Sequence, residues 1–184
     1  MTAPNAIYAT LGPAGTNHDL VLRAYLARQN SQAEVLLCPD LDEALHRCAA
    51  GSASHMMICA AHPDAGRVVS AAQYAHGIML VDAFIAESQP LAILTRAGVQ
   101  TPRSIGLHPA TRGYADLTGY DTVYEAPSTV AAFDGLTEGK WDSALAPARF
   151  AKDGEFQVVE HIQPPRDAWL ILSRDDPNED VLSL

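Results

Sequence analysis

The stretch that decides the architecture is AIYATLGPAGTN, residues 6–17. Residues 6–11 predict a short β-strand that runs straight into a turn containing two glycines and a proline. Thr16 and Asn17 follow, and beyond them apolar residues recur at helical spacing from Leu20 and Val21 onward, which predicts the start of a helix. A strand that passes through a tight turn into a helix is typical of α/β proteins.

The rest of the chain repeats this alternation at short spacing. We expect further strands at 34–37, 55–60, 78–85, 91–95, 104–108, 122–125, 143–146, 157–160 and 169–173. We expect further helices at 41–50, 67–74, 110–117, 127–135 and 147–152. The pattern predicts an α/β fold of two lobes, with the chain crossing between them near 80–95 and returning near 160–170.

Composition excludes several classes of function. The chain has 184 residues, 48% of them hydrophobic, which is enough to build a core for one domain or two small lobes. Its formal net charge is −10 and its few cationic residues are scattered, so we expect neither a nucleic-acid partner nor binding to an anionic membrane. No apolar run approaches the roughly 20 residues of a membrane span. Three cysteines without a C-x-x-C pair, and no secretory signal in Met1–Ala6, predict a cytoplasmic protein.

Small polar residues stand where three expected strands lead into helices. They are Thr16-Asn17, Pro109-Ala110-Thr111 and Ser128-Thr129. Because helix N-termini attract anions, and open α/β sheets bind ligands beyond their strand ends, these positions predict a site for a small carboxylate. The alternative is that each is only a helix cap, worth about 1 kcal/mol of stability.

Histidines supply the candidates for acid–base chemistry. His62 and His108 each precede a proline at an expected strand end, whereas His46 and His76 are expected on helix surfaces. The chain has no H-x-x-x-H or H-E-x-x-H spacing, so we expect no metal site. The turn GPAGT, residues 12–16, matches neither nucleotide-binding glycine motif, so we expect no nucleotide.

The order of these motifs resembles the catalytic domain of prephenate dehydratases. Residues 8–16 are similar to that family's opening strand and Gly-Pro-x-Gly-Thr turn, and 62–68 stand at its Glu-Asn-Ser loop. His108-Pro109 is similar to a Ser-His-Pro strand end, and 127–132 to a Ser-Ser-Thr-x-x-Ala helix start; residues 144–149, with Val158-Val159, resemble a later segment. The resemblance implies a two-lobed, periplasmic-binding-protein-like (type 2) fold with a ligand cleft between the lobes. The lobes would span about 1–80 plus 165–184 and about 81–164 of a single domain, without the family's ACT regulatory domain.

Two departures set this sequence apart from the dehydratases. The family's Thr-Arg-Phe motif is replaced by Asp167-Ala168-Trp169, with Arg166 one position before the triplet. Since a strand alternates its faces, such a shift need not restore the same geometry. The Glu-Asn-Ser loop is also lost. Bacterial prephenate decarboxylases of the bacilysin type resemble the dehydratases, lack Thr-Arg-Phe as well, and carry a Pro-x-x-Trp-like segment there, comparable to residues 165–169.

The resemblance therefore implies a lyase without cofactor or metal, acting on prephenate or a similar cyclic carboxylic acid and more similar to a decarboxylase than to a dehydratase. Thr16, Asn17, Ser128 and Thr129 would contact the substrate and Arg166 would pair with its charge; His62, His108 or Asp167 would donate the proton. Asp167 pairing only with Arg166 is the alternative for that residue, and Trp169 is expected in the core. The same residues are compatible with a true dehydratase, with a lyase or isomerase on another ring acid, and with a non-catalytic protein that binds small carboxylates. The resemblance also implies a homodimer.

Overall fold

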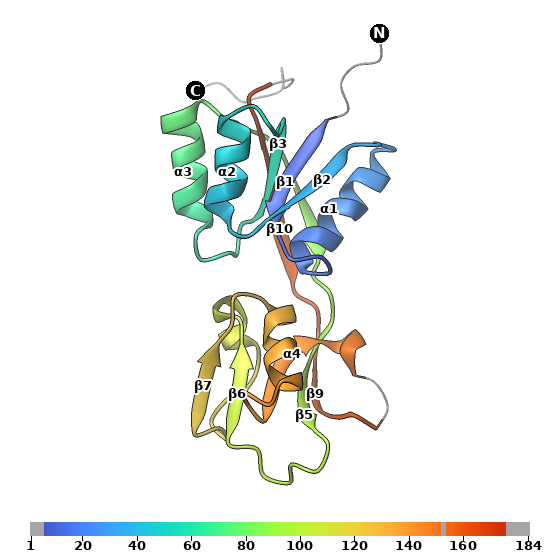
Figure 1. Cartoon of the computed structure of the whole chain (residues 1–184). Helices are drawn as coiled ribbons and strands as arrows, with labels where there is room; N and C mark the ends of the chain where they lie inside the picture. The colour runs from blue at the N-terminus through green and yellow to red at the C-terminus, as the bar shows by residue number, and fades with distance from the viewer. Residues whose placement is uncertain (1–5, 152–153, 176–184) are drawn as a thin grey trace. The chain divides into compact units, whose positions relative to one another are not determined.

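The structure, a computed structural model, describes residues 6–151 and 154–175. The contacts between these residues divide them into two units (Figure 1). Unit 1 holds the described residues up to Ala86 and from Arg166 onward, and unit 2 holds those from Glu87 to Pro165. Each unit contains a five-stranded sheet with helices, which confirms the α/β class.

The sheet of unit 1 has the strand order β2-β1-β3-β10-β4. β1 (Ile7–Leu11) pairs in parallel with β2 (Glu34–Cys38) and with β3 (His55–Cys59). β10 (Arg166–Ser173) runs antiparallel to β3, and β4 (Met79–Glu87) forms the edge. The carboxyl ends of β1 and β3 and the start of β10 consequently lie at one edge of this sheet, which we call the carboxyl edge of unit 1.

Helices cover both faces of that sheet (Figure 1). α1 (Asn17–Arg28) packs on one face in a cluster that includes Trp169, which is fully buried as expected. α2 (Leu41–Ala49) and α3 (Ala65–His76) pack on the other. His46 and His76 are exposed on these two helices, which confirms their expected surface positions.

The β1–α1 turn depends on a glycine. Gly15 has a φ of 80°, in the left-handed region that other residues adopt only with strain. At Gly12, an added Cβ would lie 3.3 Å from the carbonyl oxygen of Cys38, on the neighbouring strand. The turn therefore lies tightly against β2 and presents the first residues of α1 at the carboxyl edge.

The sheet of unit 2 has the order β7-β6-β8-β5-β9. β6 (Ser104–Leu107) pairs in parallel with β7 (Thr122–Glu125) and with β8 (Ser143–Pro147). β5 (Leu91–Arg96) runs antiparallel to β8 and also to β9 (Phe156–Ile162). The carboxyl ends of β6, β7 and β8 therefore lie together at the carboxyl edge of unit 2.

The helices of unit 2 differ in part from the sequence-based expectation. α4 (Thr129–Thr137) forms as expected and packs on one face of the sheet. The helix expected at 110–117 forms in part: it is a 3₁₀-helix, η1 (Pro109–Tyr114), in which the N–H of Thr111 donates to the His108 carbonyl three residues earlier at 2.9 Å. Gly113 disfavours a longer helix, and the segment lacks the regular apolar stripe that would pack an α-helix against the sheet. Of the helix expected at 147–152, residue 152 lies outside the described residues, and the described part contains a 3₁₀ turn, η2 (Ala148–Phe150).

None of the helices in the described ranges is long and apolar enough to cross a membrane.

Candidate functional site

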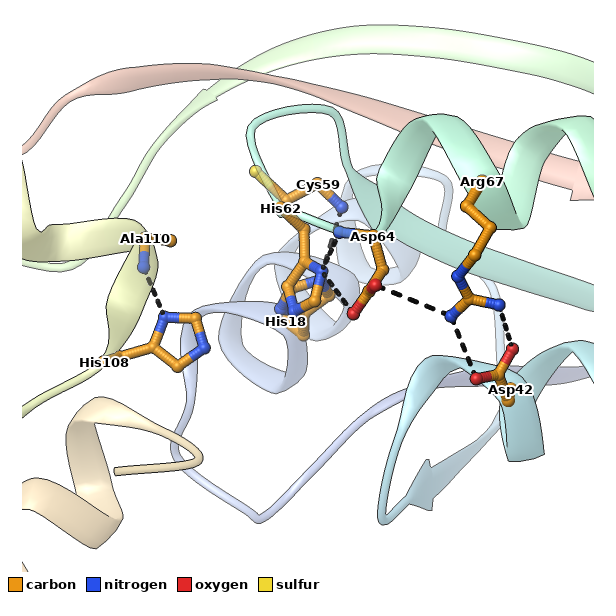
Figure 2. A network of polar contacts seen from close by, with 8 residues as sticks. All are labelled: His18, Asp42, Cys59, His62, Asp64, Arg67, His108 and Ala110. Atoms are coloured by element: carbon orange, nitrogen blue, oxygen red, sulfur yellow. Dashed lines mark hydrogen bonds and ion pairs between the residues drawn. The ribbon is translucent and has the colours of Figure 1, made fainter. Parts of the chain in front are cut away.

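His62 lies in the turn that follows β3, at the carboxyl edge of unit 1. Its side chain is only 12% exposed, and its Nδ1 accepts a 3.1 Å hydrogen bond from the backbone N–H of Asp64 (Figure 2). When the imidazole is neutral, its proton is therefore on Nε2. Burial lowers the pKa of His62, and the nearby carboxylate of Asp64, 3.8 Å from Nδ1, opposes that shift. The ring is thus oriented and partly desolvated, as a proton-transfer group requires.

A second histidine, His18, belongs to the first turn of α1 and lies beside His62. It is 7% exposed, and its Nε2 accepts a 3.3 Å hydrogen bond from the N–H of Cys59 (Figure 2). Its ring centroid lies 5.9 Å from that of His62 and 5.1 Å from that of Trp169, edge to face in both cases. His18 is a site residue that sequence reasoning missed. Its place two residues after Thr16 was a signal, since the first turn of α1 was already expected at the site.

Asp167 enters the same edge from β10. Trp169 and Ile171 pack in the cluster on the α1 face, whereas Leu170 and Leu172 pack on the opposite face. Because side chains alternate along a strand, Asp167 lies on the α1 face together with His18, whereas Arg166 shares the opposite face with Ala168. The proximity of Asp167 also affects Cys59. Burial raises the pKa of that thiol to about 11, and the charge of Asp167 adds to the increase.

Thr16 and Asn17 begin α1 at this edge. Thr16 is 5% exposed and occupies the N-cap position, but its hydroxyl makes no cap hydrogen bond; it donates instead to the Leu11 carbonyl at 3.4 Å. The buried carboxylate of Asp19 accepts a 2.7 Å hydrogen bond from the N–H of Gly15 and pairs with Arg23 at 2.7 Å. A ligand anion was expected just before α1. The N–H of Gly15 at this place is instead bonded to the protein's own carboxylate, that of Asp19.

The three expected site residues of unit 2 lie together at its carboxyl edge. The N–H of Ala126 donates to the Leu107 carbonyl at 2.8 Å, which holds the ends of β6 and β7 side by side. His108 caps η1, with its Nδ1 accepting from the N–H of Ala110 at 3.3 Å (Figure 2). Ser128 is 7% exposed and caps α4 by accepting from the N–H of Ala131 at 3.0 Å. Thr129 is the first residue of α4. Ser128 thus makes the cap hydrogen bond that the alternative interpretation of this position expects, whereas η1 is capped by His108 and not by a residue of 109–111.

Within residues 6–151 and 154–175, no three His, Cys, Asp or Glu side chains gather in a way that could hold a metal ion. All three cysteines are buried free thiols.

Comparisons with known proteins establish the fold. No family model matches the chain, and no curated protein matches it. Among solved structures, prephenate dehydratase from Arthrobacter aurescens in complex with L-Phe superposes with a TM-score of 0.70 at 21% identity, over 92% of this chain and 61% of that one. Prephenate dehydratase from Staphylococcus aureus gives a TM-score of 0.63 at 16% identity, over 92% of this chain and 66% of that one. A point mutant of arginine-bound ArgBP from T. maritima gives a TM-score of 0.52 at 14% identity, over 94% of this chain and 89% of that one.

These likenesses confirm the expected fold class, which is shared by prephenate dehydratases and by periplasmic-binding-protein-like proteins. The chain spans less than two thirds of the length of the two dehydratases. At these identities the likeness is one of fold, and function has to be argued from the site.

Proposed function

We propose that the protein is a lyase that needs no cofactor and removes carbon dioxide from prephenate or a similar cyclic carboxylic acid, while the ring hydroxyl is retained. The observation that supports this proposal is the placement of His62. It is an oriented, largely buried imidazole at the carboxyl edge of unit 1, beside His18 and on the sheet edge where Asp167 enters. Decarboxylation of such an acid requires contacts for the carboxylates, apolar surroundings for the departing group and one placed proton donor.

In this reaction the bond between the ring and its carboxylate breaks, and the electron pair stays on the conjugated ring. Protonated His62 then delivers a proton to a ring carbon and returns to its neutral form. Asp167 is the second candidate donor in unit 1, and His108 is the candidate in unit 2. In unit 1, Thr16, Asn17 and Arg166 are proposed to contact a carboxylate. In unit 2, Ser128 and Thr129 are proposed as carboxylate contacts.

The segment that replaces Thr-Arg-Phe favours decarboxylation over dehydration. Ala168 stands where the dehydratase motif has arginine and offers no charge. Trp169 stands where the motif has phenylalanine and is fully buried. Arg166 shares a face with Ala168, so a cation is available on that side of β10, but two residues from the motif position.

Product analysis tests the proposal. Purified protein is incubated with prephenate and the products are followed by NMR. A non-aromatic product that keeps the ring hydroxyl is expected. Formation of phenylpyruvate would instead identify a dehydratase. If the prephenate is unchanged, prephenate is not the substrate. His62→Gln should slow the reaction by about 10²–10⁴-fold. His46→Gln, on the exposed face of α2, is the matched control and should react like the wild type.

A second candidate is a non-catalytic protein that binds a small carboxylate. It is favoured by the use of His108 and Ser128 as helix caps and by the likeness of the fold to ArgBP. A thermal-shift series with ring acids tests it, because a ligand that binds only the folded state raises the melting temperature. Stabilisation without turnover, which persists in His62→Ala and Arg166→Ala, would favour this candidate over the lyase.

A further inference from the structure

Three parallel strands of unit 2 end at its carboxyl edge, and the segment that follows the third carries an arginine, Arg149. β6 leads to His108 and β7 leads to Ser128. β8, parallel to β6, leads to Arg149 in the middle of η2. In an open sheet the segments beyond the carboxyl ends of parallel strands form the ligand-binding edge. Arg149 therefore lies at the edge where a carboxylate was expected from the sequence.

The turn that carries Arg149 is held on two sides. The N–H of Ala148 donates to the Pro90 carbonyl at 2.9 Å, which ties η2 to the segment that enters β5. Phe150 stacks on Phe133 of α4 with ring centroids 4.5 Å apart. The Cζ atom of Arg149 lies 4.5 Å from the centroid of the Phe150 ring. Its guanidinium thus rests over an aromatic face that is itself fixed against a helix, which reduces the conformational entropy lost on binding.

The charge of Arg149 also suits an anion. Arg149 is an exposed residue, so a ligand can reach it. Partial burial lowers the pKa of its guanidinium, which nevertheless remains charged at neutral pH. Arg112, in η1, is a second arginine at this edge. Arg96 and Arg103 lie at the opposite edge of the sheet, 3.2 Å from Asp142 and 3.1 Å from Asp121. The N–H groups of a guanidinium lie around its rim, so an arginine over an aromatic ring still matches a carboxylate with two parallel hydrogen bonds.

We propose that Arg149 binds a carboxylate of the ligand at the carboxyl edge of unit 2, while the Phe150 ring packs against the guanidinium and orients it. The ligand class, a ring acid, rests on the proposed function. Arg149 acts as a binding residue and moves no proton, because its pKa is too high for acid–base work at neutral pH.

Charge-matched variants of the full chain test the proposal. The probe is 4-hydroxycyclohexanecarboxylate, a saturated ring acid that cannot form an aromatic product, with its dissociation constant measured by calorimetry. Arg149→Gln should weaken binding by roughly 10- to 100-fold, because one charged hydrogen-bonding partner is lost. Arg149→Lys keeps the charge but cannot donate two parallel hydrogen bonds. Its dissociation constant for the probe should lie between those of Arg149→Gln and the wild type. Arg103→Gln removes the same charge at the opposite edge and should bind like the wild type.

The result separates this proposal from the lyase proposal. If Arg149→Gln binds the probe as Arg103→Gln does, or if the wild type does not bind it, Arg149 is not the carboxylate residue. With prephenate, Arg149→Gln should raise KM far more than it lowers kcat. If Arg149→Gln turns over prephenate with an unchanged KM, the proposed role of Arg149 is wrong and the lyase proposal is still supported. Loss of probe binding in a protein that never turns over prephenate would support Arg149 and reject the lyase.

Discussion

The backbone N–H of Asp64 donates a hydrogen bond to Nδ1 of His62, while the carboxylate of the same aspartate lies 3.8 Å from that nitrogen. One residue thus fixes the tautomer of the neutral imidazole and also provides the negative charge that favours its protonated form. The two effects separate by substitution, because Asp64→Asn removes the charge and keeps the N–H.

This arrangement predicts a pH dependence. Burial lowers the pKa of His62 below the ordinary value of about 6.5, so the stability that comes from burying the neutral ring is present above that pH and is lost as the pH falls through the lowered pKa. If protonated His62 is the donor, the rate should rise as the pH falls over the same interval. Asp64→Asn should lower the pKa further and move both changes to more acidic pH, as NMR titration of His62 and a pH–rate profile would record. A His62 titration that moves upward in this variant would contradict the assignment.

Asp19 should be needed for the β1–α1 turn. Its buried carboxylate bonds the N–H of Gly15 and pairs with Arg23, so Asp19→Asn should reduce the free energy of unfolding by about 1–3 kcal/mol. Urea denaturation measures the loss. The control is Asp42→Asn, which breaks an exposed ion pair with Arg67 between α2 and α3 and should change stability little. Equal losses in the two variants would show that the turn does not depend on Asp19.

Trp141 makes two glycines of unit 2 indispensable. Its ring fills the space beside Gly106 of β6 and Gly135 of α4, and an added Cβ at either glycine would overlap the indole. Gly135→Ala should therefore destabilise the protein by about 1–3 kcal/mol, although alanine is normally the better helix former. Gly66→Ala in α3 is the matched control. Nothing lies within 4 Å of its added Cβ, so the variant should be more stable by roughly 0.5–1 kcal/mol. Thermal unfolding should show a lower melting temperature for Gly135→Ala and a higher one for Gly66→Ala. A higher melting temperature for Gly135→Ala would contradict the packing of Trp141 against Gly135.

Asp142 should make stability depend on pH at the acid end. It accepts hydrogen bonds from the N–H of Arg103 at 2.9 Å and from the N–H and hydroxyl of Ser104, and these contacts hold the pKa of its carboxyl below the usual value. A lowered carboxyl pKa contributes stability that is present above about pH 4 and is lost as the pH falls through the folded-state pKa. Asp142→Asn should thus be less stable at pH 7 and lose less between pH 5 and 2, as urea midpoints would show. The exposed Asp121→Asn should keep the acid transition of the wild type.

Much of the fold was accessible from local patterns. Strand-to-helix alternation, the turn at residues 12–16 and the apolar runs predicted the α/β class and most elements, because a strand with its following helix is specified by residues close in sequence. The helix expected at 110–117 is shorter and of the 3₁₀ type, since whether a short segment continues as an α-helix depends on packing outside the segment.

The candidate site divides in the same way. Sequence alone determined that polar groups would follow the strands, and it singled out His62, His108, Thr16 and Ser128. Only the tertiary structure decided that Asp167 faces α1 while Arg166 faces away, because that depends on the register of β10 against β3, strands more than 100 residues apart in the chain. It alone placed His18 against His62 and Arg149 over Phe150 at a sheet edge. Neighbours along the chain reveal which groups are available, whereas distances between groups brought together by strand pairing decide which of them can act on one ligand.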